Sequence, residues 1–274
     1  MSDHAYTEAD LALFEDLQSA ARAVRVTPCL IGAGAIRMGV DLGWDVRLGR
    51  RTDDWDFAVR VESWEHYGKL SEHLVGEGGG FERAPEPHRF RHRDGGILDV
   101  VPYGDLERPE GEILWNDGSV MDVTGMSVLD EHHDLLRLDP AELRVASLPA
   151  LVGLKLLAYV SRRPSIRRDI GDVHSVLRDV EGTVLDERIA AEALERLRSD
   201  EVSLSEVGGY LLGRDVGRIF PSADLETMST LLLEAETPES PILTDVAGGS
   251  SSAGVRQELV AARLIALRFG IIDH

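Results

Sequence analysis

Cysteine, aromatic residues, basic residues and long apolar runs are all scarce in this chain of 274 residues. The single cysteine, Cys29, excludes a disulfide framework and a cysteine-based zinc site, and it suits a reducing cytoplasm. The longest apolar run, residues 150–160, is too short to span a membrane and contains Lys155. The first ten residues are acidic and polar and show no secretory or organellar signal. We therefore expect a cytoplasmic protein that does not enter a membrane.

The shortage of basic residues excludes one class of function. Lys and Arg number 29 against 49 Asp and Glu, which gives a formal net charge of −20. A surface of that sign repels polyanions, so bulk DNA binding is excluded and any RNA contact has to be local. The chain is 43% hydrophobic and 28% charged, a composition typical of globular proteins with a core. Its length suits one large domain or two modest ones.

The N-terminal half alternates between helical and strand patterns. Thr7 and Asp10 have the spacing of a capping box that opens a helix near 7–25. Hydrophobic periodicity and turn residues then predict a strand at 29–31, a small-residue turn, a helix at 35–42, a strand at 54–61, a helix at 63–75, a hairpin from 81–84 and 88–93, and a strand at 97–101 that Pro102 closes. Short β-like pieces follow over 103–146.

From Ser147 onward the pattern is helical, with predicted helices near 147–159, 166–179, 186–199, 203–213, 224–235 and 255–269. The PESP and GGSSSAG segments predict a flexible linker over 237–254. We predict an α/β (α+β) protein with a small mixed β-sheet flanked by helices, as a catalytic domain over 1–146. An all-helical C-terminal domain over 147–274 is expected to follow it.

Three aspartates carry the chemistry that the sequence suggests. Asp54 and Asp56 project from one face of a strand of period two, and Asp99 interrupts an otherwise apolar strand. A carboxylate in such a strand is costly unless it is paired or binds a metal, and Mg²⁺ prefers oxygen ligands. The turn Gly32-Ala33-Gly34 before a helix is typical of a phosphate cradle built from backbone N–H groups.

Each feature also has a purely structural interpretation. An acidic-x-acidic pattern should occur roughly nine times by chance in a chain this acidic. A small-residue turn after a strand is usually only a tight turn. The HRFRHR run at 88–93 could line a cleft but is more typical of an exposed hairpin, and His132 and His133 are expected at the surface. The order and spacing of the features together, and not any one of them, favours a metal site.

That combination resembles the nucleotidyltransferase (polymerase β-like) superfamily, and more narrowly the AbiEii/AbiGii toxin-type nucleotidyltransferases. The match is carried by LIGAGAI at 30–36, Arg50-x-Thr52-x-Asp54-x-Asp56-Phe57, ILDVVPYG around Asp99, and the helical run from 148 to about 172. The resemblance implies a metal set and a nucleotide-binding set. The metal set, for Mg²⁺ or Mn²⁺, is Asp54, Asp56 and Asp99; the nucleotide-binding set is Gly32, Ala33, Gly34, Arg50, Thr52, Lys155 and Arg168, supported by Asp169 and Asp172.

The chain departs from the family pattern at two of these positions. Ala33 stands where Gly or Ser is usual, and Arg168 replaces a lysine before Asp169. Lys155 could contact phosphate or could be a structural lysine, and Arg168 and Asp172 could form a helix salt bridge. Asp169 and Asp172 share a helix face and could steady a neighbouring basic group.

The sequence therefore predicts a metal-dependent nucleotidyltransferase that moves an NMP from an NTP to an acceptor hydroxyl. By resemblance, the acceptor is a tRNA end or a protein side chain, with a possible toxin role and an antitoxin partner. Two alternatives remain open. One is a small-molecule, antibiotic-type nucleotidyltransferase, which the acidic surface favours for a cationic acceptor. The other is a non-catalytic nucleotide-binding protein of the same fold.

Overall fold

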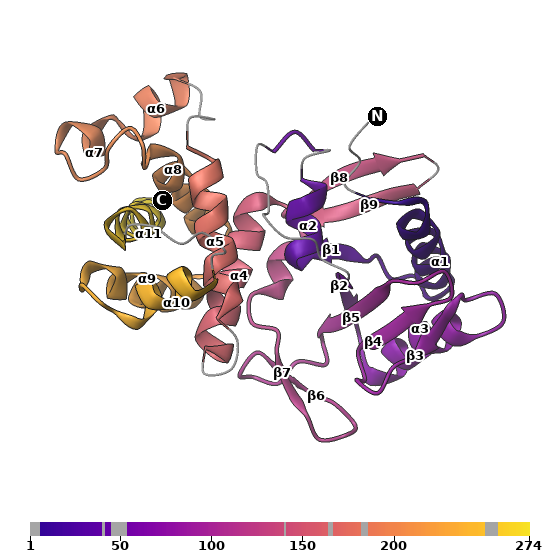
Figure 1. Cartoon of the computed structure of the whole chain (residues 1–274). Helices are drawn as coiled ribbons and strands as arrows, with labels where there is room; N and C mark the ends of the chain where they lie inside the picture. The colour runs from indigo at the N-terminus through magenta and orange to yellow at the C-terminus, as the bar shows by residue number, and fades with distance from the viewer. Residues whose placement is uncertain are drawn as a thin grey trace. The chain divides into compact units, whose positions relative to one another are not determined.

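A computed structural model describes residues 6–39, 42–44, 54–139, 141–163, 167–181, 186–249 and 257–274 (Figure 1). The described residues form two compact units. The N-terminal unit runs to Trp44 and from Asp54 to Ser147, and the C-terminal unit runs from Leu148 to His274. Among the described helices, none is long and apolar enough to cross a bilayer.

The N-terminal unit is built from a mixed sheet and its covering helices. Its elements are α1 (Glu8–Val24), β1 (Cys29–Ile31), α2 (Gly32–Met38), β2 (Asp54–Val61), α3 (Trp64–Val75), β3 (Phe81–Arg83), β4 (Arg89–His92), β5 (Ile97–Gly104), β6 (Glu112–Leu114), β7 (Val120–Asp122), a 3-10 turn (Met126–Asp130), β8 (His133–Leu138) and β9 (Ala141–Ala146). Within the described residues, seven strands form one sheet in the order β3-β4-β5-β2-β1-β9-β8 (Figure 1).

Both parallel and antiparallel pairs occur in this sheet. Strand β2 pairs parallel with β5 and antiparallel with β1, which itself pairs parallel with β9. The remaining pairs, β3 with β4, β4 with β5 and β8 with β9, are antiparallel. The predicted mixed sheet flanked by helices is confirmed, and so are the predicted strands β1 and β2 and the hairpin of β3 and β4.

Alternation along β2 builds the core face of the sheet. Trp55 and Phe57 are buried, while Asp54 and Asp56 on the other face are only partly covered. Phe14 of α1 meets both rings edge-on, with ring centroids 4.8 Å from Trp55 and 6.0 Å from Phe57. The predicted capping box opens α1, since the Thr7 side chain accepts a hydrogen bond from the Asp10 N–H. The carboxylates of β2 therefore lie on the face opposite to this aromatic core.

The predicted bounds of two elements in this unit are wrong. Strand β5 does not end at Pro102 but continues to Gly104, with Pro102 opposite Val59 of β2. The Val100 N–H donates toward the β4 side, to the carbonyl of His88, and β4 pairs with β5 no further than Asp99. The N–H that Pro102 lacks would point to the same side as that of Val100, beyond the last pair with β4, so β4 loses no hydrogen bond and β5 tolerates the proline. Helix α2 runs from Gly32 to Met38 and not over 35–42, so the predicted small-residue turn is its first turn.

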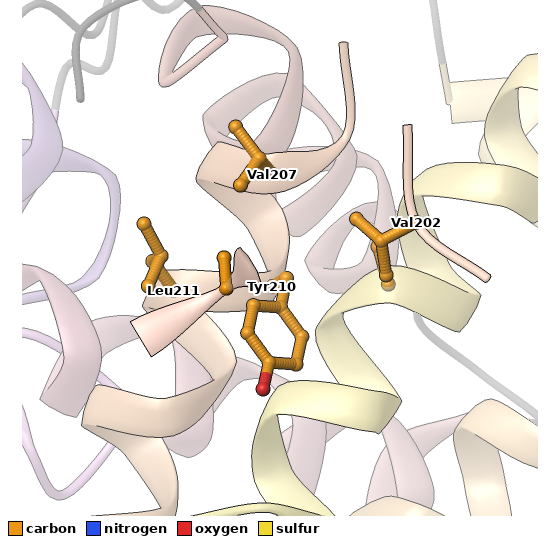
Figure 2. Close-up of a cluster of buried hydrophobic side chains, with 6 residues drawn as sticks. Val202, Val207, Tyr210 and Leu211 are labelled. Carbon is orange, nitrogen blue, oxygen red and sulfur yellow. The ribbon is translucent and has the colours of Figure 1, made fainter. Parts of the chain in front are cut away.

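The C-terminal unit is helical, as predicted. Its helices are α4 (Leu148–Arg162), α5 (Arg168–Asp179), α6 (Asp186–Glu192), α7 (Leu194–Arg198), α8 (Val207–Ile219), α9 (Ser222–Leu233), a 3-10 turn (Glu234–Glu236), α10 (Pro241–Gly249) and α11 (Gln257–Ile272). Figure 2 shows one cluster of its core, where Val202, Val207, Tyr210 and Leu211 gather beside α11.

The predicted flexible linker over 237–254 is wrong for its central part. Residues 241–249 form helix α10, in which Ile242 and Val246 are fully buried. The Tyr159 hydroxyl of α4 donates a hydrogen bond of 2.5 Å to Asp245. Apolar residues at spacings i and i+4 give this segment a buried helical face that its flanking Gly, Ser and Pro residues conceal in the sequence. Residues 250–254 of the predicted linker lie outside the described residues.

Candidate functional site

The strand register brings the predicted carboxylates into one row. In the parallel pair of β2 and β5, Asp56 lies directly opposite Asp99, and in the antiparallel pair of β4 and β5, Arg89 lies opposite the same Asp99. Asp54 is two residues before Asp56 on β2 and so shares its face. Residues from three adjacent strands thus meet on the face away from the aromatic core. Like charges directly opposite on paired strands destabilise a sheet.

Gly32 closes this row at β1. Ile31 lies opposite Asp56, and the chain then turns at Gly32 with φ +68° to start α2. A Cβ at this position would lie 2.3 Å from Asp56 Oδ2, which no neighbour can accommodate without moving. The left-handed backbone favours glycine at this position, and an added Cβ would also displace the Asp56 carboxylate.

Arg89 neutralises part of the negative charge in this row. Its Nε donates to Asp99 Oδ1 at 2.8 Å and its Nη2 to Asp99 Oδ2 at 2.7 Å, a two-pronged ion pair. Nη2 also lies 3.8 Å from Asp54 Oδ2. The hydrogen bonds to Asp99 raise the pKa of the Arg89 guanidinium. The Asp99 side chain is 7% exposed and that of Asp54 41%, so the row is open to solvent at the Asp54 end.

The donor chemistry of the row suits a hard divalent cation. Carboxylate oxygens on one face, beside a turn without a Cβ, are the ligands that Mg²⁺ prefers. In the part of the chain that the structure describes, however, no three His, Cys, Asp or Glu side chains are arranged to hold a metal ion. Both oxygens of Asp99 accept hydrogen bonds from Arg89. By donor type the three aspartates are suitable ligands for such an ion, although their arrangement in the described residues is not that of a metal cluster.

The other candidates that the sequence offers in the N-terminal half are Ala33, Gly34, Arg50 and Thr52. Ala33 and Gly34 are buried in the first turn of α2, and a Cβ at Gly34 would meet the Trp55 ring at 2.8 Å. No side chain caps this turn, because its N-cap residue is Ile31. Arg50 and Thr52 lie outside the described residues.

Lys155 belongs to a buried ionic cluster of the C-terminal unit. Its ammonium donates to Asp172 at 2.6 Å and lies 3.5 Å from Asp169, and all three residues are buried. Asp169 also accepts from Arg162 at 3.1 Å. The expectation that Asp169 and Asp172 steady a neighbouring basic group is met by Lys155. Lys155 thus links α4 to α5. This is the structural role that stands as the alternative to a phosphate contact.

The basic residues around the α4–α5 junction are mostly paired with acids. Arg163 forms a two-pronged pair with Glu234 at 2.8 Å for both contacts, and Arg167 lies 3.3 Å from Asp245. Arg168, the departure from the family pattern, is exposed at the first position of α5. These acids offset part of the positive charge at the junction.

Sequence reasoning missed Arg89 as a member of the site. The interpretation of 88–93 as a mainly exposed hairpin is wrong for part of the run, because Phe90 and His92 are buried and Arg89 is 29% exposed at the side chain. Arg91 and Arg93 follow the expectation of exposed side chains. The sequence did contain one indication. Arg89 lies in the predicted strand just before the one that contains Asp99, and a buried aspartate needs a basic partner. The register that pairs the two is a tertiary property.

Weak similarities link the chain to known structures. ANT(2'')-Ia, an antibiotic-resistance factor also solved with adenylyl-2''-tobramycin, matches over 70% of this chain and 93–95% of its own, at 16–17% identity and a TM-score of 0.35. An antigenic nucleotidyltransferase-like protein from Paracoccidioides brasiliensis matches over 71% of this chain and 89% of its own, at 15% identity and a TM-score of 0.39. The Thermotoga maritima CCA-adding enzyme, complexed with tRNA, matches over 97% and 82%, at 13% identity and a TM-score of 0.27.

No protein-family model matches the chain, and no curated protein does. At such low identities and TM-scores, the substrates of these proteins cannot be transferred to this chain. The function of this chain has to be argued from its own residues.

Proposed function

We propose that the chain is a metal-dependent nucleotidyltransferase that moves an NMP from an NTP to an acceptor hydroxyl. One observation carries this proposal: Asp56 and Asp99 lie directly opposite each other on paired strands, with Asp54 on the same face. Like charges at this spacing repel one another, Arg89 offsets part of that repulsion at Asp99, and local conflicts of this kind in a fold occur mainly at functional sites.

In this proposal, Asp54 and Asp56 hold Mg²⁺ or Mn²⁺, and Asp99 completes the set. A divalent ion bound there would neutralise phosphate charge and polarise the α-phosphate. The backbone N–H groups at the start of α2, which no side chain caps, would face the phosphate tail. Catalysis would then consist mostly of positioning and charge neutralisation.

Asp99 has a further role toward the acceptor in this scheme. It would orient the acceptor hydroxyl in line with the α-phosphate and accept its proton as the new P–O bond forms. Pyrophosphate would leave as the bond to the β-phosphate breaks. The buried position of Asp99, beside a row open at Asp54, supports this division of roles.

The acceptor class is the second part of the proposal. A tRNA end or a protein side chain, with a toxin role and an antitoxin partner, is supported only by the resemblance of residues 30–177. A cationic small molecule with a hydroxyl is supported by the net charge of −20, which attracts cations and repels RNA. Both acceptors use the same carboxylate row.

The experiment offers each of four α-³²P-labelled NTPs, with Mg²⁺, to the protein alone, to total tRNA and to a cationic aminoglycoside. We expect label to move into one acceptor class with one preferred nucleotide, and the Asp56→Asn variant to lose the transfer. Asp94→Asn is the matched control, because Asp94 is an exposed aspartate in the turn after β4. Transfer that survives in Asp56→Asn, or no transfer to any acceptor, would contradict the proposal.

A further inference from the structure

Arg89 occupies the place where a cation would contact Asp99. Both Asp99 oxygens accept from the Arg89 guanidinium, at 2.8 and 2.7 Å, and the same guanidinium lies 3.8 Å from Asp54. Arg89 thus spans two of the three carboxylates in the row. It does so from β4, the strand on the far side of β5 from Asp56.

The pairing is built into the sheet and is not a chance surface contact. Arg89 and Asp99 are register partners, so the backbone itself places the two side chains side by side. The Asp99 side chain is 7% exposed and therefore needs a positive partner wherever it is ionised. Arg89 supplies that partner.

A divalent cation and Arg89 cannot both make full use of Asp99. A carboxylate that gives both oxygens to a planar guanidinium has few lone pairs left in the right direction for a metal ion. A metal ion at Asp99 would also stand within a few ångströms of the guanidinium charge, in a partly buried place where screening is weak. The two cations therefore compete for one carboxylate.

We propose that Arg89 is a built-in competitor of the divalent cation for Asp99, and that it sets the cation affinity of the row. Binding of the ion at Asp99 releases Arg89, and removal of Arg89 strengthens ion binding by the same coupling free energy. This inference rests on the metal site of the proposed function. It adds a residue that controls when the third carboxylate becomes available.

The test is Mn²⁺ binding to the full-length protein without nucleotide, measured by electron paramagnetic resonance of free Mn²⁺. We expect Arg89→Gln to bind Mn²⁺ about tenfold more tightly than the unchanged chain, within the usual range of coupling between two ligands. Arg91→Gln is the matched control: it removes the same charge two residues along β4, from an exposed side chain. It should change the affinity much less.

A purely structural role for Arg89 predicts the opposite sign, because a disordered Asp99 would bind Mn²⁺ more weakly. Equal or weaker binding in Arg89→Gln than in Arg91→Gln overturns the inference. The gain should disappear in the double variant with Asp99→Asn, and a gain that persists there also overturns it.

Circular dichroism establishes whether each variant is folded. If Arg89→Gln does not fold, Arg89→Lys decides the question. Lysine keeps the charge but lacks the fork that engages both oxygens, so a smaller gain of about threefold is expected, and no gain is contradictory. Since this assay uses neither NTP nor acceptor, it can succeed where nucleotidyl transfer fails. The inference and the proposed function are thus tested separately.

Discussion

The glycine at the end of β1 shows how closely the carboxylate row is fitted. Gly32 turns the chain in a left-handed conformation at the one point where a side chain would meet Asp56. Sequence reasoning selected Gly32 as the start of a phosphate-binding turn. The structure adds a second reason for glycine, which is the space that the Asp56 carboxylate takes.

Gly32→Ala should be more damaging than strain alone explains. Gly43 has a similar φ of +83°, but nothing lies within 4 Å of the place that an added methyl group would take, so Gly43→Ala is the matched control. We expect the control to lower the free energy of unfolding by about 1–2 kcal/mol through backbone strain. Gly32→Ala should cost about 1–3 kcal/mol more through overpacking. Urea unfolding of both variants measures the difference. Equal costs would show that the Asp56 side chain moves aside without lowering the free energy of unfolding.

His174 gives the C-terminal unit a pH-dependent stability. Burial, with Arg263 and Arg178 nearby, lowers the pKa of His174 from 6.5 to about 4, against weaker opposing effects of Glu181 and Asp179. The Arg263 guanidinium donates to its Nε2 at 3.1 Å, which requires a neutral ring. The unfolded chain therefore binds a proton that the folded chain does not between about pH 6.5 and 4. Stability is complete above this window and falls as the pH is lowered through it.

Between pH 7 and pH 5 we expect His174 to account for a loss of about 2 kcal/mol in the free energy of unfolding. Urea titrations of the unchanged chain and of His174→Gln at both pH values measure it. Over this pH range His174→Gln should lose about 2 kcal/mol less than the unchanged chain. His73→Gln, at an exposed site on α3, should behave like the unchanged chain. Identical losses in all three proteins would exclude the buried histidine as the cause.

At the scale of elements, periodicity predicted the strands that matter. Alternation in residues 54–61 predicted β2 and the shared face of Asp54 and Asp56, because side-chain direction in a strand follows from spacing alone. The opposition of Asp56 and Asp99 and the pairing of Arg89 with Asp99 could not be predicted. They depend on the register between β2, β5 and β4, which tertiary packing fixes.

Helix α10 was missed for a different reason, because the composition of its segment predicted a linker where the structure has a helix. Ile242 is fully buried in it, whereas Thr244 is exposed. We expect Ile242→Ala to lower the free energy of unfolding by about 2–4 kcal/mol. Thr244→Ala should change it by about 0.5 kcal/mol or less. Chemical denaturation of the two variants measures this, and a negligible cost for Ile242→Ala would restore the interpretation of this segment as a linker.

At the scale of the whole molecule, charge is the property that the sequence determines most directly. Twenty excess negative charges act on every large polyanion that approaches. We expect no binding of a fluorescently labelled DNA duplex at about 0.15 M salt, measured by fluorescence anisotropy. Micromolar binding with a steep dependence on salt would show a local basic surface strong enough to outweigh the net charge.

The central claim is that the carboxylate row binds a nucleotide through a divalent cation, and equilibrium binding tests it most directly. Isothermal titration of the four NTPs, with Mn²⁺ and with EDTA, should show binding of at least one nucleotide only when Mn²⁺ is present. Asp56→Asn should weaken that binding about tenfold or more, a cost of about 1.4 kcal/mol. Nucleotide binding that is equal in EDTA, or equal in Asp56→Asn, would contradict the account.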